Sequence, residues 1–330
     1  MSIDLVHGGS LDYMVQQFPS APKPWLDLST GINPRPYPIA SIQVSALNHL
    51  PTTTAYDNCR KAMATAFLCP KETIMPAPGS EVLIRLLPTI IKPKKIAVLS
   101  PTYGDHLKVW RMEGLDVVES PDLLLENKNA DCVVLCNPNN PDGQTFNYET
   151  LTALHTLMRE RNGWLILDEA YIDLYPHLSF CSQAGADNLI ILKSIGKFYG
   201  LAGLRLGALI APPPILNAMA QRLGVWSISD FALDIGAKVY KDAAWKTQTR
   251  THLQGASQRL RAILLQAGLT ITGSTDLFSF VETQNAHSLW EQLAKLGIYT
   301  RRFSWSETHL RIGMPADEAG ERHLKQALNL

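Results

Sequence analysis

Hydrophobic residues in the middle of the chain occur in short, unbroken runs, and these runs predict buried β-strands. The runs cover residues 94–101, 114–120, 131–138, 163–170, 188–194 and 204–213. Runs that are apolar throughout, rather than at every second position, are typical of strands buried on both faces of a parallel sheet. Amphipathic helical patterns lie between them, at 80–91 and 148–161. This alternation predicts an α/β fold: a large doubly wound domain with a mostly parallel central sheet.

The pattern changes near residue 215. Helical periodicity dominates residues 232–268, and short strand patterns follow at 269–274, 277–283 and 308–314. We therefore expect a smaller α+β domain over 215–330 and the large domain over 31–214. Residues 1–30 lack a clear period and are rich in Gly and Pro, which suggests an arm that crosses the surface or joins the small domain.

Composition excludes several classes of partner. Thirty basic residues balance thirty acidic ones, so no net field attracts nucleic acid or an acidic membrane. The apolar stretch 82–91 is interrupted by Arg85 and Pro88 and is far shorter than the roughly 20 residues of a membrane helix. The N-terminus does not resemble a signal peptide. We expect a cytoplasmic protein with a small-molecule partner.

The five cysteines do not predict a disulfide framework or a metal site. Their number is odd, and the chain has the character of a cytosolic protein. Cys132 and Cys136 are the only close pair, but no His lies near them in sequence. We interpret them as buried thiols that pack as small apolar residues.

Lys197 is the strongest candidate for catalysis. It follows the apolar run 188–194 in a Gly-rich loop, with Ser194 three residues before it and Arg205 eight residues after it. A lysine in a partly desolvated pocket loses its proton more readily and attacks an aldehyde, although an isolated loop lysine is usually only solvated. The glycine spacing in this loop is not G-x-G-x-x-G, which argues against a nicotinamide-dependent dehydrogenase.

Three further signals fall at the ends of predicted strands, where open parallel sheets bind ligands. Asp168 ends an apolar run, and a buried carboxylate needs a cationic or hydrogen-bonding partner, such as a protonated pyridine nitrogen, a helix N-terminus or a core cation. Asn140 lies in a Pro-rich turn from which its amide could donate to a ligand oxygen. Gly79 and Ser80 open a helix, and helix N-termini attract anions.

These segments, in this order and spacing, resemble the class I/II aminotransferase family of fold-type I pyridoxal-phosphate enzymes over nearly the whole chain. The resemblance implies that Lys197 binds the cofactor as a Schiff base and that Asp168 and Tyr171 assist it as catalytic residues. The implied cofactor-binding residues are Gly79, Ser80, Tyr103, Asn140, Asp168, Tyr171, Ser194, Lys197 and Arg205, with Tyr56 reaching the cofactor phosphate of a neighbouring subunit. The active form would therefore be a homodimer, and Arg311 would bind the α-carboxylate of the substrate.

The N-terminal motifs VHGGS (6–10) and LDLSTGINP (26–34) resemble the threonine-phosphate decarboxylase branch of cobalamin biosynthesis. That branch implies conversion of L-threonine O-3-phosphate to (R)-1-amino-2-propanol phosphate. A histidinol-phosphate-type aminotransferase is the alternative within the family. A non-catalytic cofactor-sensing module is the alternative from another class, disfavoured because we find no N-terminal helix-turn-helix pattern and no net positive charge.

The substrate's orientation decides which reaction occurs, because the bond at Cα that lies perpendicular to the cofactor ring is the one that breaks. We hypothesise that His7, Asn33 and Arg302 hold the substrate phosphate or carboxylate and so set this orientation. The sequence does not decide between Arg302 and its neighbour Arg301.

Overall fold

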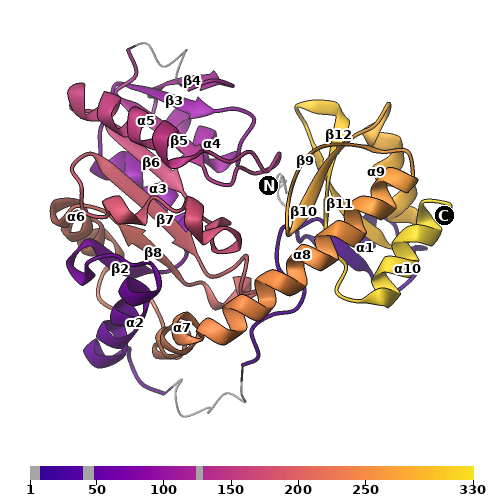
Figure 1. Cartoon of the computed structure of the whole chain (residues 1–330), viewed down its shortest axis with the longest axis horizontal. Helices are drawn as coiled ribbons and strands as arrows, with labels where there is room; N and C mark the ends of the chain where they lie inside the picture. Colours follow the sequence, from indigo (N-terminus) through magenta and orange to yellow (C-terminus); the bar gives the residue numbers. More distant parts are fainter. Residues whose placement is uncertain (1–7, 40–47, 124–128) are drawn as a thin grey trace. The chain divides into compact units, whose positions relative to one another are not determined.

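The structure is a computed structural model that describes residues 8–39, 48–123 and 129–330. The chain divides into two compact units, which are described separately (Figure 1). The larger unit comprises residues 36–140 and 144–246. The smaller unit comprises residues up to 35, residues 141–143 and residues 247–330.

A seven-stranded sheet forms the centre of the larger unit, in the order β2-β8-β7-β6-β5-β3-β4. Its strands are β2 (Ile74–Ala77), β3 (Lys95–Leu99), β4 (Asp116–Ser120), β5 (Cys132–Cys136), β6 (Trp164–Asp168), β7 (Leu189–Ser194) and β8 (Gly207–Ile210). Within this sheet only β8 runs against the other strands. The predicted α/β class and mostly parallel sheet are confirmed.

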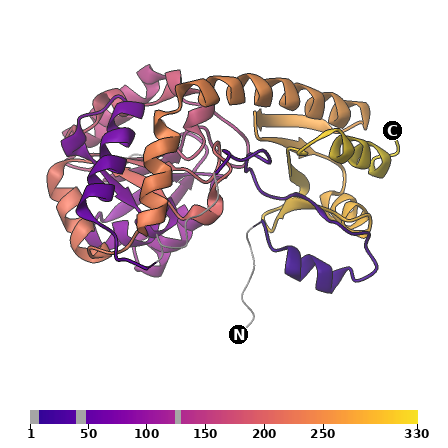
Figure 2. The same cartoon turned by 90° about the horizontal axis from the view of Figure 1, so that it is seen from below.

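Helices cover both faces of this sheet (Figures 1 and 2). They are α2 (Thr53–Ala66), α3 (Ser80–Ile90), α4 (Asp105–Met112), α5 (Tyr148–Glu160), α6 (Pro213–Leu223) and α7 (Asp230–Lys241). Short 3₁₀ turns lie at Lys71–Thr73, Ile172–Leu174, Pro176–Leu178, Cys181–Gln183 and Ala202–Leu204. On one face α3, α4 and α6 bury Leu83, Val109 and Leu216 against the strands. Burial on both faces explains why the central strands read as unbroken apolar runs.

The smaller unit has a five-stranded sheet in the order β1-β11-β12-β10-β9. Its strands are β1 (Leu26–Leu28), β9 (Thr270–Thr275), β10 (Phe278–Glu282), β11 (Ile298–Phe303) and β12 (Ser306–Gly313). Its helices are α1 (Leu11–Gln17), α8 (Ala243–Gln266, whose first four residues group with the larger unit), α9 (Ala286–Lys295) and α10 (Glu318–Ala327). Leu260 of α8, Trp290 of α9 and Leu324 of α10 share one core with Val281 and Leu310 of the sheet. These helices therefore pack on one face of the sheet and do not cover the opposite face.

The unit boundaries differ from those expected at residues 30 and 214. Residues 215–246 group with the larger unit, because α6 inserts Ile215, Leu216 and Met219 into its core. The N-terminal segment groups with the smaller unit, which is the second of the two alternatives expected for it: β1 pairs in parallel with β11, and Met14 of α1 is fully buried.

The long helical pattern at 232–268 is two helices in the structure. α7 is followed by Asp242, whose carboxylate accepts a hydrogen bond from the backbone N–H of Trp245 at 2.9 Å and so helps start α8. Among the described residues, no helix is long and apolar enough to cross a membrane.

Candidate active site

A cavity of about 160 Å³ lies in the larger unit at the carboxyl ends of β5, β6 and β7. Its lining includes nine of the side chains and glycines predicted to bind the cofactor: Gly79, Ser80, Tyr103, Asn140, Asp168, Tyr171, Ser194, Lys197 and Arg205. These residues are up to 126 positions apart in sequence (79 to 205), so the fold brings them together. Ligands bind at this edge in open parallel sheets, because the loops that follow the strands converge there.

One end of the cavity is built to hold an anion. Ser80 begins α3, whose first backbone N–H groups lack partners within the helix and attract negative charge. Gly79 has φ of +88°, and a Cβ atom there would lie 3.0 Å from Nη2 of Arg205. Arg205 itself is left-handed, with φ of +49°, and its Nη2 lies 3.6 Å from Oε2 of Glu81. Glycine at position 79 thus lets the guanidinium approach the helix N-terminus.

Lys197 lies in the loop after β7 and is half-buried. Its Nζ is 5.7 Å from the centre of the Tyr171 ring. Tyr171 is buried in the loop after β6. Ser194, the last residue of β7, accepts a hydrogen bond from the N–H of Gly196 at 3.2 Å, which fixes the start of the lysine loop. The amine is therefore presented to the cavity next to an aromatic face.

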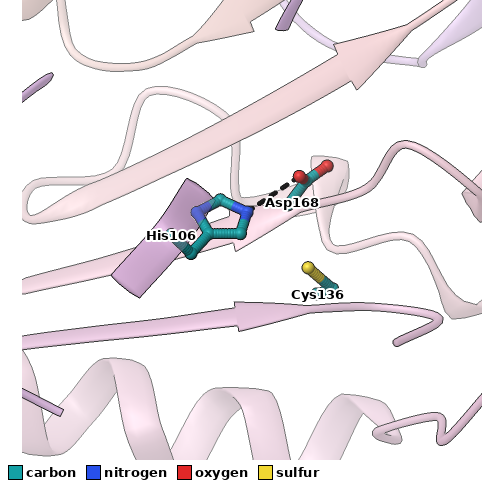
Figure 3. A group of neighbouring side chains, drawn as sticks. All are labelled: His106, Cys136 and Asp168. Carbon is teal, nitrogen blue, oxygen red and sulfur yellow. Dashed lines mark hydrogen bonds and ion pairs between the residues drawn. The ribbon is translucent and has the colours of Figure 1, made fainter. Parts of the chain in front are cut away.

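Asp168 is held by two hydrogen bonds, and Figure 3 shows the one that joins it to His106 within a buried cluster. Its Oδ1 accepts from the N–H of Ala170 at 3.0 Å, and its Oδ2 lies 2.9 Å from Nε2 of His106 on α4. Burial by itself lowers the pKa of His106, but the neighbouring Cys136 and Asp168 outweigh it and raise that pKa to about 10. Asp168 also lines the cavity, where its carboxylate is a suitable partner for a cationic ligand group.

His106 was not recognised from the sequence. It lies three residues after Tyr103, a residue that the sequence did indicate. This i, i+3 spacing at the start of a helix puts the two rings on the same side. Their ring centres are 5.9 Å apart in an edge-on arrangement. The hydroxyl of Tyr103 donates to the buried Asp105 at 3.2 Å, and Arg85 pairs with the same carboxylate at 3.3 Å. The orientation of Tyr103 beside the cavity is therefore fixed from outside it.

Tyr56 does not line the cavity of its own chain. It lies on α2, and its hydroxyl is 3.5 Å from the carbonyl oxygen of Pro76. Burial raises the pKa of Tyr56 to about 12, so the hydroxyl stays protonated and can donate. Its predicted role in a neighbouring subunit stays a prediction.

The smaller unit contains the described residues predicted to bind substrate. Arg311 on β12 is buried, donates from Nη2 to the carbonyl oxygen of Ser29 at 2.7 Å, and lies over the Phe278 ring. Asn33 is also buried, and its Oδ1 accepts from the N–H of Arg35 at 2.9 Å.

The strand register separates Arg301 from Arg302. Arg301 on β11 is directly opposite Arg311, so both side chains lie on the face of the sheet that the helices leave open. Arg302 is opposite Leu310, on the helix-covered face, because neighbouring residues of a strand point to opposite sides. Its guanidinium bonds Nδ1 of His287 at 2.8 Å and lies over the ring of Trp290.

The two N-terminal motifs meet in the structure. The N–H of Gly9 donates to Oγ of Ser29 at 2.8 Å, and a Cβ on Gly8 would lie 2.5 Å from the carbonyl oxygen of Ser29. Ser29 in turn donates to Asp27 at 2.6 Å. The Gly-Gly pair is needed for this close approach. His7 lies outside the described residues.

Comparison with known proteins identifies the family of the chain. The family model of class I and II aminotransferases matches residues 24–328. The chain belongs to this family.

Two curated relatives, both threonine-phosphate decarboxylases, align with the chain over almost its full length. The protein of a Sinorhizobium species is 37% identical over 99% of this chain and 98% of its own. The Pseudomonas aeruginosa protein is 36% identical over 98% of this chain and 97% of its own.

Solved structures show the same fold. The histidinol-phosphate aminotransferase of Sinorhizobium meliloti, in complex with pyridoxal-5'-phosphate, superposes with a TM-score of 0.82 at 20% identity, over 96% of this chain and 92% of that one. The fold assignment therefore rests on both sequence and structure.

Proposed function

We propose that this protein is a pyridoxal-phosphate-dependent enzyme that decarboxylates L-threonine O-3-phosphate to (R)-1-amino-2-propanol phosphate and carbon dioxide. The observation that carries this proposal is the end-to-end similarity, at 36–37% identity, to two threonine-phosphate decarboxylases. The packing of the Gly8–Gly9 motif on Ser29 adds support, because these are the segments that resemble that branch.

The cavity's donor set fits pyridoxal phosphate. The N-terminus of α3 with Ser80, Ser194 and Arg205 suits a phosphate, the buried Asp168 suits a protonated ring nitrogen, and the Lys197 amine suits an aldehyde. When bound, the cofactor supplies an electron sink for the bond that breaks at Cα of the substrate.

The chain's own residues prepare and complete the reaction. Asp168, held by its contact with His106, would stabilise positive charge on the ring nitrogen of the bound cofactor. Tyr171 and Asn140 line the cavity, where the hydroxyl of the one and the amide of the other would donate hydrogen bonds to an oxygen of the bound cofactor. Lys197 would hold the aldehyde carbon of the cofactor and, once released by the incoming substrate amine, would donate the proton that Cα requires after carbon dioxide has left.

Arg301 and Arg311 are suited to hold the anionic groups of the substrate. Like charges directly opposite each other on neighbouring strands repel, and an anion bound between or beside them removes this cost. We therefore propose Arg301 rather than Arg302 as the substrate residue, together with Arg311 and Asn33. His7 remains a proposed member of the set.

The proposed active form is a cytoplasmic homodimer acting in cobalamin biosynthesis. Leu50, Val225 and Trp226 are 60%, 82% and 62% exposed in the single chain. Thr52 donates to Asp230 through its backbone N–H at 2.8 Å, so the segments before α2 and α7 lie side by side. Exposed apolar side chains gathered in this way are typical of a subunit interface, and Tyr56 lies on the same helix α2.

The test is a single-substrate assay. The purified protein, loaded with pyridoxal phosphate, is incubated with L-threonine O-3-phosphate and no keto acid. We expect stoichiometric release of carbon dioxide and aminopropanol phosphate, and no release by Lys197→Ala. Inactivity in this assay, together with amino transfer from histidinol phosphate to a keto acid, would establish the aminotransferase instead.

A further inference from the structure

Three buried side chains with metal-binding atoms meet at the inner end of the cavity. His106 comes from α4, Cys136 ends β5 and Asp168 ends β6. One ligand atom from each, an imidazole nitrogen, a sulfur and a carboxylate oxygen, all lie within 4.8 Å of one another (Figure 3). The proposed reaction uses the carboxylate and the imidazole but gives no task to the thiol.

This donor set selects for a particular class of cation. Imidazole, thiolate and carboxylate together favour zinc and similar divalent metals, whereas magnesium and calcium prefer oxygen ligands alone. With zinc–ligand bonds of about 2.0–2.3 Å, the ligand atoms of a tetrahedral site are about 3.3–3.6 Å apart. His106 Nε2 and Asp168 Oδ2, now 2.9 Å apart, would separate slightly, and the sulfur would move inward.

The surroundings favour metal entry and orient the thiol. Cys136 and Asp168 both line the cavity, so a fourth ligand such as water can occupy the open position, and the ion has a path to the site. The hydroxyl of Thr102 donates to Oδ1 of Asn139 at 2.7 Å, and its oxygen lies 3.3 Å from Cys136 Sγ, so a fixed polar neighbour limits the movement of the sulfur. Zinc sites in which three protein ligands are held in place and the fourth position is open typically carry a water molecule in that position.

We propose that the cofactor-free chain binds one zinc-class divalent cation at His106, Cys136 and Asp168, and that the cation and pyridoxal phosphate exclude each other. Both need the Asp168 carboxylate, so this exclusion rests on the cofactor part of the proposed function and not on the decarboxylation. The metal would thus oppose cofactor loading.

The experiment titrates zinc into cofactor-free protein kept reduced with a phosphine, in competition with a chromophoric chelator. We expect about one tight zinc ion per chain, with affinity at least tenfold weaker in Cys136→Ser, since even the loss of an outer partner costs roughly 10–100-fold. Cys132→Ser is the matched control: it is a buried cysteine on the same side of the same strand, and it should bind zinc like the wild type.

A second measurement needs no variant. Zinc should slow alkylation of Cys136, mapped by mass spectrometry, and leave the rate at Cys69 unchanged, and prior loading with pyridoxal phosphate should abolish the zinc effect. Absence of tight zinc, equal binding by wild type and Cys136→Ser, or equal binding by cofactor-loaded protein each overturns the proposal. Before zinc is added, the visible absorbance of pyridoxal phosphate mixed with zinc-free protein is recorded. A protein that does not bind the cofactor is thereby distinguished from one that does not bind zinc.

Discussion

At the scale of single residues, the pair Arg301 and Arg302 gives a sharp test of the substrate site. Arg301 shares the open face of the sheet with Arg311, whereas Arg302 is engaged by His287 and Trp290 on the other face. We expect Arg301→Gln to raise KM for threonine phosphate by roughly 10–100-fold, the effect of losing a charge-assisted hydrogen bond of about 1.5–3 kcal/mol. Steady-state kinetics on both variants provides the measurement.

Arg302→Gln is the control for this prediction. It removes the same charge one position along the same strand, and its KM should stay within about threefold of the wild type, as for a surface substitution. A larger rise in KM for Arg302→Gln than for Arg301→Gln would contradict the assignment. Both variants should bind the cofactor normally, because both positions are in the smaller unit.

The same pair shows where residue-level prediction ends. Lys197 and Asp168 could be proposed from sequence because each follows or ends an apolar run, and Arg205 could be proposed because its segment resembles the family. The choice between adjacent arginines could not, since it depends on how β11 pairs with β12, and a shift of one residue reverses every side chain. His106 was missed for a related reason: its partner Asp168 is 62 residues away.

At the scale of elements, the packing of β8 against the start of α3 is critical for the anion end of the cavity. A Cβ on Gly207 would lie 2.5 Å from the carbonyl oxygen of Lys193 and 3.0 Å from the backbone nitrogen of Ser80. Gly207→Ala must therefore push β7 or the first turn of α3 aside. We expect a loss of about 1–3 kcal/mol in the free energy of unfolding, with weaker uptake of pyridoxal phosphate.

Chemical denaturation and a cofactor titration measure these two effects. Gly203→Ala, in the 3₁₀ turn that precedes β8, is the matched control, because nothing lies within 4 Å of a Cβ added there. Wild-type stability and cofactor affinity in Gly207→Ala would show that the strand does not constrain the helix start.

Element prediction succeeded where burial was uniform and was incomplete where it was not. The runs behind β3, β5, β6 and β7 are apolar throughout and were found close to their true bounds. β2 was missed because Pro76 interrupts its pattern. Proline is tolerated there because β2 is an edge strand that pairs only with β8. Whether a strand can contain a proline thus depends on its position at the edge or in the middle of the sheet, and the sequence pattern does not reveal that position.

At the scale of the whole molecule, the division into units depends on packing and not on the change of pattern along the chain. The shift to helical periodicity near residue 215 is real, but α6 and α7 still belong with the larger unit. α7 packs along α2, the helix that carries Tyr56. The exposed residues Leu50, Val225 and Trp226 therefore lie in the unit that contains the cofactor cavity. A dimer formed through them would use the same unit that binds the cofactor.

That link predicts the effect of disrupting the proposed interface. Trp226→Asp places a charge at an exposed apolar position next to Val225, and we expect it to weaken the proposed dimer by roughly thirtyfold or more, as for an interface hot spot of at least 2 kcal/mol. Light scattering during gel filtration gives the mass. Leu68→Asp, at an 86% exposed leucine beyond the other end of α2, should stay dimeric. If Tyr56 completes the cofactor phosphate site of the partner subunit, cofactor affinity must fall in Trp226→Asp, together with the dimer mass. Cofactor affinity must stay unchanged in Leu68→Asp. A monomeric Trp226→Asp protein with full cofactor affinity would show that the cofactor site does not depend on the dimer.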